Sequence, residues 1–317
     1  MENHASMQNK LPVIFLMGTT ATGKTDLAAK LFAQGGYELV SVDAAQIFRD
    51  MNIGTAKPDE AFLKQFPHHL INVRSPLQSY SAAEFCNDVN SLIMDIHNRG
   101  LIPILVGGTM FYFHAFENGL SELPAANPEV RKQIADQLQK HGLPRLYEWL
   151  TELDFKFSQT IKPTDSQRIQ RALELALSTN QKPSDLMMNS KPSGTHYPLI
   201  KLALFLPDRN KLHEQIEIRF RQMLDHGLLG ELSQLIEQYS GIKNAPSMRT
   251  VGYRQPLEYL NGDIDYEQMI EKGVAATRQL AKRQLTWMRQ QSNLVWVQAD
   301  HAQSYAAVNR YLESTLG

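Results

Sequence analysis

The sequence has one cysteine, almost no net charge and no long hydrophobic run, and each absence excludes a class of protein. Because Cys86 is the only thiol among 317 residues, an internal disulfide framework is excluded and a reducing compartment is expected. Cys86 itself is expected to be a small buried residue. The formal net charge of −1 provides no global field for nucleic acid, so any such partner needs a local basic patch.

No apolar run approaches the roughly 18 residues of a membrane-spanning helix. Residues 1–10 are polar and lack the pattern of an export signal. The length predicts about two domains. We therefore expect a soluble, cytoplasmic protein without membrane association.

The chain does contain a complete GxxxxGK[ST] motif, directly after the apolar stretch Val13–Met17. A strand that enters a glycine-rich turn and then a helix directs several backbone N–H groups and a helix N-terminus at one point. Lys24 adds a positive charge there, and the Thr25 hydroxyl is suited to bind Mg²⁺. A chance match in a flexible loop is the alternative, which the flanking segments disfavour. The motif predicts a polyphosphate site formed by a phosphate cradle, Gly18-Thr19-Thr20-Ala21-Thr22-Gly23-Lys24-Thr25.

The first third of the sequence alternates strand-like and helix-like segments, which is typical of an α/β fold. A helix is expected from Lys24 to about Gln34, and the capping box Ser81-Ala82-Ala83-Glu84 starts another that reaches Arg99. Asp208 is expected to cap a later helix. The predicted strands are Val13–Met17, Tyr37–Val42, His69–Val73, Leu101–Val106 and Ile200–Leu206, with a short apolar segment at Leu294–Val297.

Between the fourth and fifth of these strands the sequence changes character. Helices are expected from Asn127-Pro128 and over Asp165–Thr179, followed by a polar, proline-containing loop over Lys182–Pro198. We predict a P-loop NTPase-like α/β core with a parallel sheet, formed by residues 1–120 and 196–317. An all-helical insertion, residues 121–195, interrupts this core, and the C-terminal region is mostly helical.

Ligands of such sheets gather beyond the carboxyl ends of the strands, where two further segments lie. Asp43 follows the second strand and is suited to act as a general base. The string Asp43-Ala44-Ala45-Gln46 is also a capping box, and the two readings are compatible. Gly107-Gly108-Thr109 follows the fourth strand and either lets a ligand approach the backbone or forms a tight turn capped by Thr109.

No apolar strand that ends in a second aspartate of the kind found in NTPases is evident. A motor or switch ATPase is therefore disfavoured, although the cradle alone is typical of ATP-binding proteins. The phosphate is expected to belong to a substrate that transfers another group.

Three arginine-rich segments with few acids contrast with the near-zero net charge. Late in the chain, Arg278, Lys282 and Arg289 share one helix face. The other two segments are Gln167–Arg171 and Arg249–Arg254. Each segment alone is explained by a solvated helix face, whereas three together favour a phosphate-backbone partner.

Read together, these segments resemble the bacterial tRNA dimethylallyltransferases, also called tRNA isopentenyltransferases. The similarity extends over nearly the whole chain, although Ala44 stands where that family more often has serine. It is carried by the cradle, Ser41–Gln46, Asn52–Pro58, Pro67–Ile71, Tyr80–Phe85, Val106–Tyr112, Gln167–Glu174, Met248–Gln255 and Ala276–Gln284 with Thr286-Trp287.

The resemblance implies that a dimethylallyl group moves from dimethylallyl diphosphate to N6 of the adenosine on the 3′ side of the anticodon in tRNA. Diphosphate is released and Mg²⁺ is required. It also implies that the adenosine is flipped out, since its amino group is unreachable within a base stack. The helical insertion would grip the anticodon stem-loop, and a monomer is expected.

Residue roles follow from the same resemblance. Asp43 would be the catalytic base, Thr109 would contact the flipped nucleotide, and Lys24 would neutralise the leaving group. Residues Gly18–Thr25 together with Arg219 would bind the diphosphate, with Thr25 on Mg²⁺. The implied tRNA-binding residues are Asp43, Ala44, Ala45, Gln46, Thr109, Arg131, Gln167, Arg168, Ile169, Gln170, Arg171, Arg249, Thr250, Val251, Gly252, Tyr253, Arg254, Arg278, Gln279, Lys282, Arg283 and Gln284.

Three alternatives stay open at this point. A P-loop kinase of small metabolites shares the cradle and the core but leaves the basic segments unexplained. An adenylate prenyltransferase that acts on free nucleotides has no need for the helical insertion. A non-catalytic RNA-binding module predicts affinity for RNA without any product.

Overall fold

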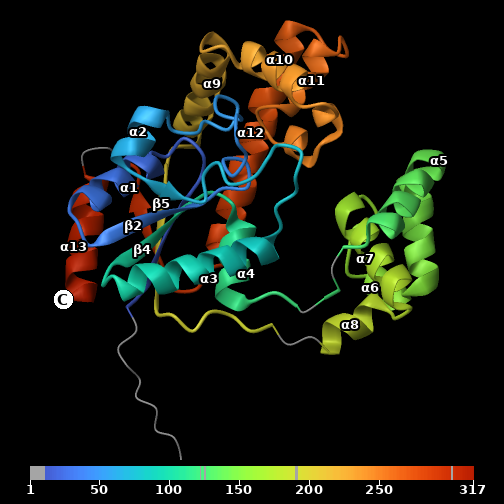
Figure 1. Ribbon diagram of the computed structural model, residues 1–317, viewed down its shortest axis with the longest axis horizontal. Helices are drawn as coiled ribbons and strands as arrows, with labels where there is room; N and C mark the ends of the chain where they lie inside the picture. The colour runs from blue at the N-terminus through green and yellow to red at the C-terminus, as the bar shows by residue number, and fades with distance from the viewer. Residues whose placement is uncertain (1–10, 122, 125, 190–191, 301–302) are drawn as a thin grey trace, which may run out of the picture. The chain divides into compact units, whose positions relative to one another are not determined.

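The computed structural model describes residues 11–121, 123–124, 126–189, 192–300 and 303–317. The chain divides into two compact units (Figure 1): a core unit, residues 1–115 and 196–317, and a helical unit, residues 116–195. Within the described parts of the chain, no helix is long and apolar enough to cross a membrane. The export-signal expectation falls on residues 1–10, which lie outside the described residues.

The core unit is built on a parallel sheet with the strand order β3-β2-β4-β1-β5-β6. Its central strand β1 lies between β4 and β5, so that Leu16 pairs with Val106 on one side and Leu202 on the other. A parallel strand covered on both faces needs apolar residues in succession, and β1 is buried along its whole length. The strands are β1 (Val13–Gly18), β2 (Tyr37–Val42), β3 (His68–His69), β4 (Ile102–Gly107), β5 (Leu199–Phe205) and β6 (Leu294–Gln298).

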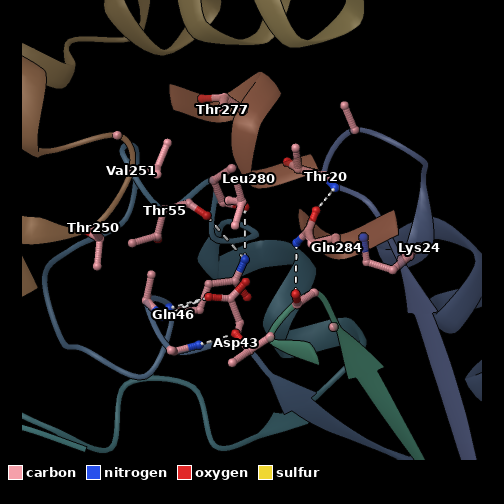
Figure 2. Close-up of a pocket in the computed structure, with 18 of the residues that line it drawn as sticks. Thr20, Lys24, Asp43, Gln46, Thr55, Thr250, Val251, Thr277, Leu280 and Gln284 are labelled. Carbon is pink, nitrogen blue, oxygen red and sulfur yellow. Dashed lines mark hydrogen bonds between the residues drawn. The ribbon is translucent and has the colours of Figure 1, made fainter. Parts of the chain in front are cut away.

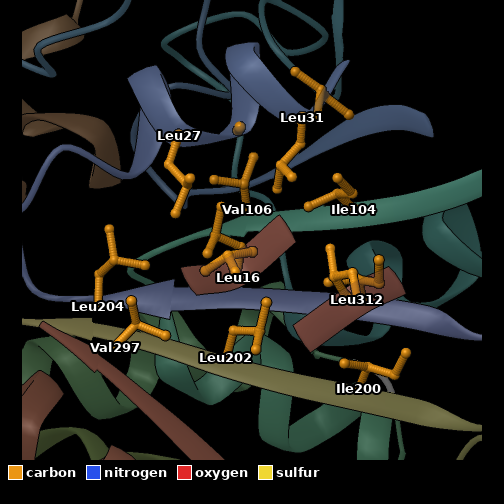
Figure 3. Close-up of a cluster of buried hydrophobic side chains, with 14 residues drawn as sticks. Leu16, Leu27, Leu31, Ile104, Val106, Ile200, Leu202, Leu204, Val297 and Leu312 are labelled. Atoms are coloured by element: carbon orange, nitrogen blue, oxygen red, sulfur yellow. The ribbon is translucent and has the colours of Figure 1, made fainter. Parts of the chain in front are cut away.

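Helices cover both faces of this sheet. On one face, α1 (Lys24–Ala33) and α13 (Ser304–Leu316) pack against the strands and form one apolar cluster with them (Figure 3). On the other face, the ring of Phe113 in α4 (Met110–Asn118) lies 4.9 Å from the ring of Phe15 in β1. The cluster under α1 and α13 includes Leu16, Leu27, Leu31, Ile104, Val106, Ile200, Leu202, Leu204, Val297 and Leu312.

The predicted α/β core with a parallel sheet is confirmed. The expected third strand, His69–Val73, is wrong because β3 contains only His68 and His69. Leu70 and Asn72 adopt φ angles of 64° and 59°, in the left-handed region, and a strand cannot continue through them.

Two of the remaining helices of the core unit, α3 and α9, begin at the expected capping residues. The Ser81 side chain accepts from the backbone N–H of Glu84, which completes the capping box. Asp208 accepts from the N–H groups of Asn210 and Lys211 and so caps α9 as expected. These elements are α2 (Glu60–Gln65), α3 (Ala82–Asn98), α9 (Arg209–Asp225), α10 (Leu228–Gln238), the 3₁₀ turns η1 (Ile242–Asn244) and η2 (Pro246–Arg249), α11 (Arg254–Leu260) and α12 (Tyr266–Arg289).

The helical unit contains α5 (Pro128–Leu153), α6 (Phe155–Ser158), α7 (Ser166–Thr179) and α8 (Pro183–Asn189). Asn127 caps α5 as expected, and Gly142 interrupts it with a φ of 78°. The predicted loop over Lys182–Pro198 is wrong in its first part, because α8 occupies it. Pro183 stands at the first position of that helix, where its fixed φ is favourable and its missing N–H costs nothing. The unit has its own core of Ile134, Leu146, Leu150, Ile161, Ile169, Ala172 and Leu173.

Candidate functional site

Three neighbouring strands deliver the main candidate groups to one cavity of the core unit. β2, β4 and β1 lie side by side, and at their carboxyl ends the chain continues into Asp43, Gly108-Thr109 and the cradle. Because the strands are parallel, these ends meet at the same edge of the sheet. They border a cavity of about 670 Å³ whose other walls come from α9, from α12 and from the loops that contain Gly54 and Arg249.

The cradle is held in its turn by backbone conformation and by two internal hydrogen bonds. Ala21 and Gly23 have φ angles of 63° and 75°, and Gly23 caps α1. The Thr22 hydroxyl and the Lys24 ammonium group both donate to the carbonyl oxygen of Thr19, at 2.8 and 2.6 Å. A side chain at Gly18 would come within 2.8 Å of the Leu204 carbonyl oxygen, so glycine is required where the chain passes β5.

Two cations, Lys24 in α1 and Arg219 in α9, border the cavity. Burial, helped by the positive charge of Arg219 and opposed by Asp43, lowers the pKa of Lys24 to about 7. Burial also lowers the pKa of Arg219, and Asp43 opposes this shift. Among the described residues, no carboxylate forms an ion pair with either cation. Two desolvated charges of the same sign without a paired acid make a site for an anion.

Asp43 is held by the turn that follows β2. Its Oδ1 accepts from the backbone N–H groups of Ala45 and Gln46, at 2.8 and 3.2 Å. Burial raises the pKa of Asp43 above its usual range, although these bonds and the nearby Lys24 and Arg219 act in the opposite direction. A carboxylate with a raised pKa is a stronger base.

The expected capping box at Asp43 is wrong in part. Asp43 caps the backbone as predicted, but turns rather than a helix follow it. The Gln46 side chain does not supply the second bond of a capping box, which would join it to the Asp43 N–H. Its side-chain nitrogen instead donates to the carbonyl oxygens of Thr55 and Ala56 (Figure 2).

The turn after β4 connects Asp43 to the cradle. The Thr109 hydroxyl accepts from the backbone N–H of Ala44 at 3.0 Å, so it joins the turns that follow β2 and β4. The Gln284 side chain of α12 accepts from the Thr20 N–H at 3.0 Å and donates to the Gly108 carbonyl oxygen at 2.9 Å (Figure 2). The structure therefore brings the cradle, Asp43 and Thr109 together through short, specific bonds.

An apolar wall of the cavity was missed by the sequence analysis. Ile216, Phe220 and Met223 project from α9 at helical spacing, Leu280 and Trp287 come from α12, and Phe111 comes from α4. In the sequence, such a helical stripe cannot be distinguished from core packing. The wall gives the cavity a cationic side and an apolar side.

The segment Arg249–Arg254 is fastened to the loop that contains Gly54 by an acid that the sequence analysis also missed. The Glu231 carboxylate accepts from the N–H groups of Asn52, Ile53 and Gly54 and from the Tyr253 hydroxyl. Arg249, Thr250, Val251 and Gly252 line the cavity, whereas Tyr253 is fully buried. Arg254 is exposed and ion-paired with Glu258.

The basic face of α12 is only partly free. Arg278 pairs with Glu217 of α9 at 3.3 Å. Gln279 and Lys282 are exposed, Arg283 lines the cavity, and Gln284 is 6% exposed.

Two of the candidates in the helical unit bind one buried acid. Arg131 and Arg171 both bind the Glu174 carboxylate, each at 2.9 Å. Burial alone would raise the pKa of Glu174, but these bonds outweigh that effect and lower it. Gln167 and Arg168 are exposed and Gln170 bonds to Ser166, whereas Ile169 is fully buried in the unit's core.

Comparisons with known proteins agree along most of the chain. A family described as IPP transferase matches residues 46–291. A tRNA dimethylallyltransferase of Legionella pneumophila (strain Paris) is 50% identical over 281 residues, which are 89% of this chain and 89% of that protein. One of Thiobacillus denitrificans is 45% identical over 298 residues, covering 93% of this chain and 95% of that protein.

Two solved structures are similar over nearly the whole chain. The full-length tRNA isopentenylpyrophosphate transferase of Bacillus halodurans has a TM-score of 0.71 at 30% identity and covers 97% of both chains. A eukaryotic dimethylallyltransferase acting on tRNA has a TM-score of 0.77 at 27% identity, with 95% of this chain and 77% of that chain covered.

Proposed function

The chain belongs to the IPP transferase family, and we propose that it transfers a dimethylallyl group from dimethylallyl diphosphate to an adenosine of tRNA. The proposed acceptor atom is N6 of the adenosine on the 3′ side of the anticodon, and diphosphate is the second product. The observation that carries this proposal is the meeting of an anion site, a base and an apolar wall in one cavity.

Each wall of the cavity suits one part of the substrates. The cradle, Lys24 and Arg219 suit the diphosphate, because both cations lack an ion-paired acid among the described residues. The apolar residues of α9 and α12 suit a five-carbon prenyl group. Asp43 and Thr109 suit the amino group of the adenine.

The proposed reaction forms one bond and breaks one. The N6 lone pair of adenosine attacks C1 of the dimethylallyl group, and the C1–O bond breaks with its electron pair leaving on the diphosphate. The proton lost from N6 goes to the Asp43 carboxylate. Lys24 and Arg219 stabilise the negative charge that develops on the leaving oxygen. No water has to be activated, which is consistent with a strand β4 that ends in Gly107 rather than in an acid.

We also propose that Mg²⁺ accompanies the diphosphate. Thr25 lines the cavity and offers a single hydroxyl, and no cluster of three or more acids, histidines or cysteines that would hold a metal occurs among the described residues. This sparse donor set fits Mg²⁺, which is commonly bound through substrate phosphates and water with few protein ligands. When bound, the ion would neutralise part of the diphosphate charge.

tRNA is proposed to bind through the exposed basic residues of both units. Arg249 and Arg283 border the cavity, and Lys282 and Arg168 are exposed. The buried Ile169 and Tyr253 are instead proposed to support their neighbours. A monomer is proposed, since a single chain supplies every residue of the reaction above. A cytoplasmic location is proposed because the substrate is tRNA.

The proposal is tested by incubating the protein with dimethylallyl diphosphate and Mg²⁺, and with either unmodified tRNA or AMP as the acceptor. Digestion to nucleosides and mass spectrometry then identify the product. Prenylated adenosine from tRNA alone is expected. A mapped fragment of the anticodon loop locates the modified position.

Other outcomes would support the alternatives. Product from AMP indicates a free-nucleotide prenyltransferase, and transfer of a phosphoryl group from added ATP indicates a kinase. Tight tRNA binding without any product indicates a non-catalytic module. Any of these three results contradicts the proposed function.

A further inference from the structure

A single side chain, that of Gln284 in α12, spans the gap between the cradle and the turn after β4 (Figure 2). Its carbonyl oxygen accepts from the Thr20 N–H, and its nitrogen donates to the Gly108 carbonyl oxygen, at 3.0 and 2.9 Å. Gln284 is 6% exposed, so both bonds are shielded from water. The amide thus fixes the cradle relative to the β4 turn.

The β4 turn is shaped to receive this amide. A Cβ at residue 108 would lie 2.5 Å from the Gln284 nitrogen, so only glycine admits the contact. The Gln284 amide has two N–H donors and two acceptor positions, and one of each holds two backbone segments of the protein together. These contacts indicate a role inside the protein that the sequence analysis did not anticipate.

The bridge continues toward the base. Residue 109 follows Gly108 directly, and the Thr109 hydroxyl accepts from the Ala44 N–H. The next residue back is Asp43, whose carboxylate is fixed by the Ala45 N–H at 2.8 Å. A continuous series of covalent and hydrogen bonds therefore runs from the cradle through Gln284 to Asp43.

We propose that Gln284 is a positioning residue that sets the spacing between the bound diphosphate and the base, and so between the donor carbon and N6. This inference rests on the proposed function. Reacting atoms must lie about 3–3.5 Å apart and in line, and a displacement of about 1 Å can cost on the order of 10²-fold in rate. The Gln284 bridge between the two half-sites, the cradle that holds the diphosphate and the turn that holds Asp43, fixes this distance.

The first test is Gln284→Met, which has a similar length but cannot form either bond. We expect the turnover number with tRNA to fall about tenfold or more, because the half-sites lose their fixed spacing. The dissociation constant for tRNA should change by less than about twofold, since no phosphate contact is lost. Lys282→Ala, on the same helix, is the matched control and should weaken tRNA binding. An unchanged turnover number, or a loss of tRNA affinity that matches the loss of turnover, overturns the inference.

The second test is Gln284→Glu, which distinguishes positioning from mere packing by its pH dependence. A protonated Glu forms both bonds, with its carbonyl accepting from Thr20 and its hydroxyl donating to Gly108. An ionised Glu places an acceptor against the Gly108 carbonyl. Burial should raise the pKa of this carboxyl in the folded state above its unfolded value, as it does for Asp43 in the same cavity although Lys24 and Arg219 act in the opposite direction. The ratio of variant to wild-type activity should therefore fall as the pH rises.

The stability of Gln284→Glu supplies a readout that needs no activity. Because the folded-state pKa is raised, the carboxyl supports the fold at low pH and this support is lost as the pH rises through that pKa. The gap in melting temperature between wild type and variant should widen with rising pH. A gap that does not change with pH contradicts the bridge, whereas a wild type that makes no product contradicts the proposed function.

Discussion

Asp43 in the core unit and Glu174 in the helical unit are both shielded acids next to basic residues, and their pKa values shift in opposite directions. Glu174 binds Arg131 and Arg171 directly, and its pKa is lowered although burial opposes the shift. Asp43 has only backbone N–H groups as direct partners among the described residues, and burial raises its pKa. The arginines next to Glu174 are neutralised, whereas Lys24 and Arg219 near Asp43 are not.

This difference shows how two similar sets of charges serve different purposes. A direct ion pair stabilises a carboxylate and makes it a poor base. Keeping Asp43 out of such a pair preserves its basicity and leaves two cations available for an anionic leaving group. In the helical unit, the same residue types tie the start of α5 to α7, because Glu174 also accepts from the Asn127 N–H.

The largest expected effect comes from Asp43→Asn, which removes the base but keeps the size of the side chain. The turnover number should fall by about 10²-fold or more, because proton transfer from N6 is lost. tRNA affinity, measured by filter binding, should be retained. Equal losses of turnover and affinity would show that Asp43 acts only as a backbone cap.

Arg219→Gln should have the next largest effect, on the donor half of the reaction. Removing one cation from the anion site should lower kcat/KM for dimethylallyl diphosphate by about 10²-fold. Arg221→Gln is the matched control, since Arg221 lies on the same helix but is ion-paired with Glu217. Steady-state kinetics at saturating tRNA measure both, and equal effects of the two substitutions would refute a diphosphate contact by Arg219.

The pH dependence of diphosphate binding should reveal Lys24. Its pKa of about 7 in the ligand-free protein must rise when an anion binds, so binding takes up a proton. Affinity should be greatest below pH 7 and should fall by up to about tenfold per pH unit above it, as linkage requires. Calorimetry with Mg²⁺-diphosphate on wild type and on Lys24→Met tests this, because titration of the ligand contributes equally to both slopes. An equal slope in the two proteins would contradict the assignment.

Glu174→Gln should have the smallest effect, and it falls on stability. Losing the acid leaves the Arg131 and Arg171 side chains without their partner and should cost about 1–3 kcal/mol of unfolding free energy. Because its pKa is lowered on folding, Glu174 stabilises the protein above its ordinary pKa, and this support is lost as the pH falls through the folded value. The melting-temperature gap to wild type should therefore narrow in acid. If Glu174→Gln lowered the unfolding free energy at neutral pH by less than Asp43→Asn does, this result would contradict the comparison between the two acids.

Local sequence signals predicted much of the fold. The apolar strands other than the third, the Ser81 capping box and the Asp208 cap depend on neighbours within a few residues, and the structure confirms them. The prediction of the third strand was wrong because Leu70 and Asn72 adopt left-handed backbone conformations. Neither residue is a glycine, and no turn motif in the sequence signals this change of conformation. The helix at Pro183 was missed because proline and serine occur both in loops and at helix starts.

The sequence by itself determined the cradle, because a phosphate loop needs its glycines, lysine and threonine at fixed local spacing. It also placed Asp43 and Thr109 at strand ends. Only the tertiary structure decided that β2, β4 and β1 lie side by side and that α12 places Gln284 between their ends. These contacts join residues far apart in the chain, and the pKa shifts of Lys24 and Asp43 arise from a burial that only the packed fold creates.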